Sequence, residues 1–208
     1  MSNVDILRSK LIYYKKPIIK KDFLQKIIDA QTPGYSIAEM CKRKLLEPLK
    51  KWVYYFNLES REFVNPYVIG KLYCEWVQYC FGGMNVYNMY GFTTQLPNYM
   101  TLYTNVYLGE KDIKDQKYMF KKVRPSFFRG MKETTIAHEK IMIMTPERAL
   151  IQMIIDGNSL EFLQHQPDNI DQKKLRKMAN TYASKTVLHR VNILIWQRQI
   201  PPCESNTT

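Results

Sequence analysis

Proline and glycine residues divide the middle of the chain into short helices. Asn65-Pro66 is typical of a helix start, because Asn accepts bonds from free backbone N–H groups and Pro has no N–H to satisfy at the first helical position. Apolar residues then recur at helical spacing over 67–78, and Gly82-Gly83 breaks the run. A second short helix is predicted over 84–90, closed by Gly91, since glycine suits the left-handed position after a helix.

The second half of the chain predicts a mixed α+β domain with a small sheet and terminal helices. Aromatic and β-branched residues predict three strands, at 99–107, 118–123 and 140–144. The segment Gly109 to Asp115 is predicted to be a polar loop. Thr145-Pro146-Glu147 predicts a helix start with a Thr cap, a first-position Pro and an acid facing the helix dipole, and we assign Glu147 a structural role. Two closing helices are predicted, over 170–182 and 187–196.

Three segments of this pattern carry a resemblance to a known family. Asn65 to Leu72, Phe81 to Phe92 and Ile141 to Leu150, preceded by a basic helical head, resemble the AbiEi-type antitoxins, regulators of bacterial abortive-infection toxin–antitoxin systems. The resemblance implies a winged-helix head that binds operator DNA and represses its own operon. It further implies a C-terminal domain that counteracts a nucleotidyltransferase-like toxin. The chain departs from the family pattern at Pro48, where members usually continue a helix, and its wing lacks a Gly-rich tip.

The charge of the chain points to a polyanionic partner. The formal net charge is +12 and the isoelectric point is near 9.4. Residues 1–56 hold 12 Lys and Arg against 5 Asp and Glu, a net +7, so the excess is densest in the head. Lys and Arg clustered on one face neutralise phosphates and release counterions. A basic surface that serves only solubility is the alternative.

The head is predicted to be a winged helix-turn-helix over residues 1–62, followed by a second domain over 63–208. Its three helices are expected near 6–14, 21–28 and 36–45, with the wing at 49–56. Ser36 and Glu39 form a capping box at the third helix, whose apolar positions face inward and leave three cations outside. The predicted contacts to double-stranded operator DNA are Ser36, Lys42, Arg43, Lys44, Lys50 and Lys51.

Other interpretations of the same residues stay open. A stand-alone DNA-binding regulator without a toxin fits the head equally well. A protein-interaction adaptor with an incidental basic surface fits too, because helix-turn-helix shapes also serve as interaction modules. A secondary basic patch is predicted at Lys173, Lys174, Arg176 and Lys177, where a solvated helix face is the alternative.

The sequence offers little chemistry to an enzyme. It contains no phosphate-binding Gly-rich loop, no Gly-x-Ser-x-Gly elbow and no His-Glu-x-x-His motif. The pair His138-Glu139 is read as strand residues whose side chains point to opposite faces. The four cysteines are scattered without metal-ligand spacing, so we predict no cofactor, no metal and no catalysis. No segment is apolar enough for a membrane span and the start lacks the apolar core of a signal peptide, which predicts a cytoplasmic protein without a membrane partner.

Overall fold

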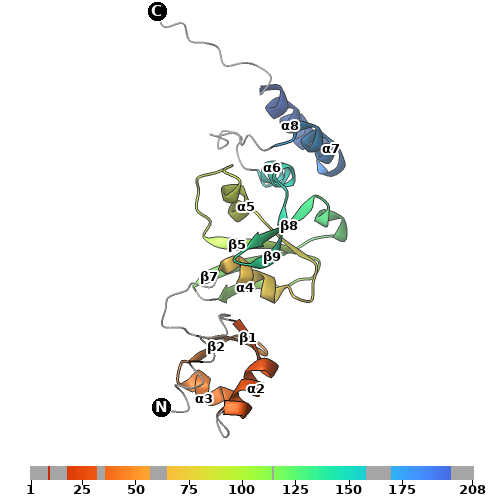
Figure 1. Cartoon of the computed structure of the whole chain (residues 1–208). Helices are drawn as coiled ribbons and strands as arrows, with labels where there is room; N and C mark the ends of the chain where they lie inside the picture. The colour runs from red at the N-terminus through yellow and green to blue at the C-terminus, as the bar shows by residue number, and fades with distance from the viewer. Residues whose placement is uncertain are drawn as a thin grey trace, which may run out of the picture. The chain divides into compact units, whose positions relative to one another are not determined.

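The chain divides into two compact units, Met1–Asn65 and Pro66–Thr208. The computed structural model describes Ser9 and residues 18–31, 36–56, 65–113, 115–157 and 170–197 (Figure 1). These parts hold seven α-helices, a three-stranded antiparallel sheet and a six-stranded mixed sheet, so the α+β class is confirmed. The predicted helix at 6–14 lies, apart from Ser9, outside the described residues.

The first unit combines two helices with the three-stranded sheet. Its elements are β1 (Ile18–Lys20), α2 (Lys21–Gln31), α3 (Ile37–Lys42), β2 (Leu46–Lys50) and β3 (Val53–Phe56). The central strand is β3, which pairs antiparallel with β1 on one side and with β2 on the other. Because β2 is an edge strand, Pro48 is accommodated there without removing a hydrogen bond from a central ladder.

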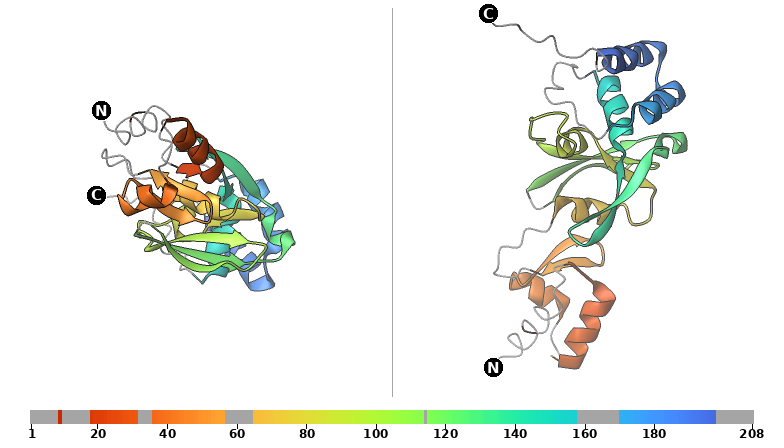
Figure 2. Two further views of the ribbon diagram at one scale, coloured as in Figure 1. Left: turned by 90° about the horizontal axis from the view of Figure 1, so that it is seen from below. Right: turned by 45° about the horizontal axis from the view of Figure 1, so that its top comes forward.

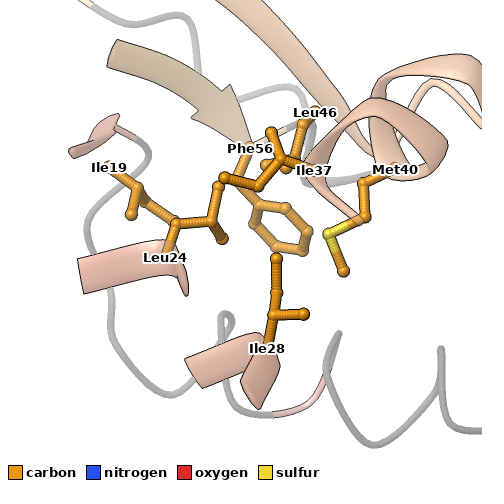
Figure 3. Packing of buried hydrophobic residues seen from close by; sticks show 7 residues of the cluster. All are labelled: Ile19, Leu24, Ile28, Ile37, Met40, Leu46 and Phe56. Atoms are coloured by element: carbon orange, nitrogen blue, oxygen red, sulfur yellow. The ribbon is translucent and has the colours of Figure 1, made fainter. Parts of the chain in front are cut away.

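A single apolar cluster holds the first unit together (Figure 3). It draws on both helices and all three strands, and its members are Ile19, Leu24, Ile28, Ile37, Met40, Leu46 and Phe56. Burying one such side chain contributes about 1.5–3 kcal/mol, which offsets the entropy of ordering these short elements. The helix α3 and the β2–β3 hairpin are therefore fixed relative to each other.

The third predicted helix is shorter than expected. It ends at Lys42 and not near Leu45, because a turn closes it: Leu45 N–H donates to the Met40 carbonyl and Lys44 N–H to the Cys41 carbonyl, both at 3.0 Å. This is a Schellman motif, and Lys44 occupies its left-handed position with φ 58°. This motif is hard to predict from the sequence, because glycine normally occupies the left-handed position.

The six-stranded sheet forms the centre of the second unit. Its strands are β4 (Tyr79–Gly82), β5 (Tyr99–Thr104), β6 (Gly109–Ile113), β7 (Gln116–Lys122), β8 (Met131–Ile136) and β9 (Glu139–Met144), in the spatial order β6-β7-β5-β4-β9-β8. The pairs β5–β7 and β4–β9 are parallel, and the other three pairs are antiparallel. The sheet is larger than the small one predicted.

Two predictions in this unit are wrong, and two of its strands were not predicted. The loop expected from Gly109 to Asp115 is largely strand β6, because pairing with β7 overrides the polar sequence of an edge strand. The helix expected to reach Gln78 ends at Tyr73 as α4 (Pro66–Tyr73). Tyr79 then begins β4, a largely buried strand. Its four residues are too few to show the alternation of apolar and polar residues by which a strand is predicted. The strand β8 was not predicted at all.

Helices cover both faces of the sheet (Figures 1 and 2). Helix α4 packs on β5 and β9 from one face, while α5 (Met84–Met89) and α6 (Pro146–Ile155) pack from the other. The closing helices α7 (Gln172–Tyr182) and α8 (Lys185–Gln197) lie against α6. Gly91 follows α5 at φ 71°, as predicted. None of the helices in the described ranges is long and apolar enough to cross a membrane.

Helix α6 is the most enclosed element of the second unit. Its start is the predicted one, since the Thr145 hydroxyl accepts from Arg148 N–H at 3.4 Å and Pro146 takes the first position. Polar side chains are nevertheless buried with the apolar ones: Glu147 is 3% exposed, Arg148 2% and Gln152 6%. A simple buried stripe, as the sequence predicts, does not describe this helix.

Candidate nucleic-acid interface

Four of the six predicted DNA contacts lie in the short helix α3 or at its two ends: Ser36, Lys42, Arg43 and Lys44. Lys42, Arg43 and Lys44 are all exposed, as the sequence analysis expected. The Arg43 guanidinium lies 3.2 Å from the Glu39 carboxylate, so its charge is partly engaged within the helix. Within the described parts of the chain, Lys42 and Lys44 have no acidic partner. Two cations at the end of this helix are therefore available to a polyanion.

Ser36 serves as the N-cap of α3. Its hydroxyl oxygen accepts from Glu39 N–H at 3.2 Å, which satisfies one of the free donors of the first turn. The side chain stays exposed, so the same hydroxyl keeps its own proton for an outside acceptor.

The tip of the β2–β3 hairpin carries the second group of predicted contacts. Lys51 and Trp52 form the turn between the strands, and the bulge in β2 between Pro48 and Lys50 precedes it. Lys51 is exposed, whereas Lys50 is half-buried and engaged in contacts of its own. Leu46, at the other end of β2, lies beside α3. The strand from Leu46 to Lys50 is about 13 Å long, because each strand residue adds about 3.3 Å. The hairpin tip and the end of α3 are thus separate cationic points on one rigid unit.

Two residues of this tip were missed by sequence reasoning. Trp52 is 51% exposed, and the Lys21 ammonium lies 3.9 Å from the centroid of its indole. Lys21 N–H also donates to the Trp52 carbonyl at 2.8 Å, and the Lys51 ammonium lies 5.5 Å from the same ring. In the sequence Trp52 looks like a strand former. The one signal of an exposed tip is its position directly after Lys50 and Lys51 and directly before a strand, where no glycine is available to form the turn.

The secondary basic patch is split by the geometry of α7. Three cations, Lys173, Arg176 and Lys177, line an open pocket of about 460 Å³ together with Gln172 and Asn180. Lys174 turns to α6 instead, where its ammonium lies 3.3 Å from the Glu147 carboxylate. Lys174 therefore has a structural partner, whereas no acidic side chain of the described residues pairs with the three pocket cations.

Burial shifts the pKa values of several ionisable groups inside the second unit. Burial raises the pKa of the Cys80 thiol to about 12, which keeps it protonated at neutral pH and poorly nucleophilic. Burial likewise lowers the pKa of the Arg148 guanidinium. His138 lies in the β8–β9 turn at φ 62° and not in a strand, while Glu139 pairs with Lys71 at 2.8 Å. Among the described residues, no group of three or more His, Cys, Asp or Glu is arranged to hold a metal ion.

Comparison with known proteins places the fold. No protein-family model matches the chain, and no curated protein does. Among solved structures, the chain is similar to the RV2827C protein from Mycobacterium tuberculosis, with a TM-score of 0.65 over 94% of this chain and 76% of that chain. The two sequences are 11% identical, so the similarity concerns the fold alone.

Proposed function

We propose that this protein is a DNA-binding transcription regulator and the antitoxin of a toxin–antitoxin pair. The first unit is assigned as a winged helix-turn-helix in which α2 and α3 form the helix pair and the β2–β3 hairpin forms the wing. It binds operator DNA and represses its own operon in the cytoplasm. The second unit counteracts a nucleotidyltransferase-like toxin, and the protein has no catalytic role of its own.

One observation carries the DNA-binding part of this proposal. Three lysines at these two places have no acidic partner among the described residues: Lys42 and Lys44 at the end of α3, and Lys51 at the tip of the hairpin. A shared apolar core fixes the two elements. Lysines held on two elements of one rigid unit can neutralise phosphates of a duplex, which carries one phosphate charge per roughly 1.7 Å of its axis.

The test is binding to duplex fragments from the upstream region of the gene at increasing salt. Affinity is expected to fall steeply with salt, and Lys42→Ala or Lys51→Ala is expected to weaken every sequence and to flatten the salt slope by about one unit each. The matched control is Lys111→Ala, which removes an exposed lysine from strand β6 of the second unit. Absence of binding at low salt, or binding indifferent to salt, contradicts the assignment.

A second candidate function, contact with a protein partner, is favoured by two exposed aromatic residues. Trp76 is 87% exposed and Tyr107 is 76% exposed. Gln78 and Asn105 exchange hydrogen bonds at 3.1 and 3.2 Å just beyond the β4–β5 pair. Trp76 lies in the turn before this strand pair, and Tyr107 lies in the connection that follows it. Exposed Trp and Tyr are enriched at the energetic centres of protein interfaces.

We assign these two exposed aromatic residues to the contact with the toxin. Coexpression of the toxin with a Trp76→Ala, Tyr107→Ala double variant tests it. Loss of rescue with DNA binding intact supports the contact, and full rescue by a folded double variant excludes it.

A further inference from the structure

Trp52 occupies a backbone conformation that a bulky residue rarely adopts. Its φ is 69°, in the left-handed region where glycine is the ordinary choice. The turn between β2 and β3 is only two residues long, Lys51 and Trp52, so the chain has to reverse there. Packing does not account for the choice, because half of the side chain faces solvent. The hairpin therefore carries backbone strain at the residue that it displays.

The displayed ring is surrounded by positive charge. Lys21, which follows β1, contacts Trp52 in two ways. Its backbone N–H donates to the Trp52 carbonyl at 2.8 Å, and its ammonium lies 3.9 Å from the centroid of the indole. The Lys51 ammonium approaches to 5.5 Å. Ammonium groups over an indole face restrict the motion of the ring, so the ring is preorganised and little ordering entropy remains to be lost on binding.

An exposed, preorganised indole between two lysines matches one kind of ligand surface. A duplex presents apolar deoxyribose and base edges between two rows of phosphate, and proteins that read the minor groove place apolar side chains in it beside cations. A protein partner offers no comparable alternation of apolar surface and regular negative charge.

We propose that Trp52 is a nucleic-acid contact residue that packs its indole into the minor groove of duplex DNA, while Lys21 and Lys51 neutralise the flanking phosphates. The inference rests on the proposed DNA-binding function and adds a residue and a groove to it. The ring supplies apolar contact that lysines alone cannot supply, and the contact persists at salt concentrations that screen the lysines.

The decisive variant is Trp52→Gly in the full chain, because it relieves the backbone strain and removes the ring together. The probe is a fluorescein-labelled A·T-rich duplex of about 30 base pairs, titrated at low and moderate salt. We expect the melting temperature to hold or rise and the affinity to fall about tenfold, because the large apolar contact area of the indole is lost. Trp52→Phe, which keeps a ring, is expected to lose less.

The control variant is His138→Gly. It relieves a similar left-handed residue, φ 62°, in the β8–β9 turn of the second unit and is expected to leave DNA affinity unchanged. A wild-type chain that binds DNA with steep salt dependence, alongside a Trp52→Gly variant of equal affinity, overturns the inference and leaves the proposed function standing. A wild-type chain that binds no duplex overturns both. A Trp52→Gly variant that melts well below wild type overturns it as well, because the ring is then required for folding.

Discussion

The guanidinium carbon of Arg148 lies 4.6 Å from the centroid of the Phe127 ring. The Tyr182 ring covers it at 5.0 Å, and Phe127 packs in turn on Tyr103 with centroids 4.5 Å apart. These contacts join the 3₁₀ turn η1 (Pro125–Phe128), α6, α7 and β5 around one buried cation. Within the described residues, Nε and Nη1 of Arg148 have no hydrogen-bond partner. Aromatic faces, and not a carboxylate, therefore stabilise this charge.

Replacing Arg148 with Met is expected to be mild and with Ala severe. Met retains most of the buried volume and removes a charge whose desolvation opposes folding, so the free energy of unfolding should change by less than about 1 kcal/mol. Ala leaves a cavity and should cost about 2–5 kcal/mol. Urea denaturation of both variants decides the question. Equal losses in the two would show that the guanidinium itself, through its cation–π contacts, stabilises the unit.

The Glu147–Lys174 pair is expected to contribute more than the first-turn position of Glu147 suggests. A carboxylate at a helix start contributes about 0.3–1 kcal/mol when exposed, but this side chain is 5% exposed and faces the Lys174 ammonium at 3.3 Å. Glu147→Gln should therefore lower the free energy of unfolding by about 1–2 kcal/mol. The loss stays this small because Lys174 is half-exposed and is solvated by water in the variant. A double-mutant cycle with Lys174→Met measures the coupling. A coupling energy near zero would assign the cost to the helix dipole alone.

Local sequence signals predicted the helix boundaries well where a cap residue marks them. Ser36, Thr145 and Gly91 each occupy the expected position at a helix end, because the hydrogen bond or backbone conformation that they supply is local. The end of α3 was predicted three residues too late because no such cap residue marks it. Lys44 takes the left-handed position, and nothing about a lysine announces that conformation.

Strand pairing and the buried polar residues lay beyond the reach of the sequence. The strand β6 is polar and forms only because β7 offers a partner across a tight turn. The exposed lysines of α3 followed from helical periodicity, whereas the clasp of Lys21 on Trp52 depends on β1 and β3 lying side by side. The burial of Arg148 depends on rings contributed by η1 and α7, distant segments that no short window contains.

Two glycine substitutions at the end of α3 are expected to act in opposite directions on stability. Lys42 is the last helical residue, so Lys42→Gly should cost up to about 1 kcal/mol of helix propensity. Lys44 is left-handed, so Lys44→Gly should stabilise the first unit by up to about 1 kcal/mol. Each change removes one cation, and DNA affinity should fall similarly in both. Thermal melting and salt titrations of the pair separate the two effects, and a Lys44→Gly variant that melts lower would refute the strain at this turn.

The second unit is expected to fold without the first. Pro66–Thr208 is a compact unit with buried apolar residues of its own, among them Phe81, Leu102 and Ile143. A fragment of residues 66–208 should therefore unfold cooperatively in urea and resist limited proteolysis. Under the proposed function the fragment should also rescue cells that express the toxin, although it lacks the lysines assigned to operator DNA. Its matched control is the full chain with Lys42→Ala and Lys51→Ala, in which repression is weakened and the second unit is intact. Rescue that is lost in the folded fragment and in the control alike would mean that repression of the operon, and not the second unit, protects the cell.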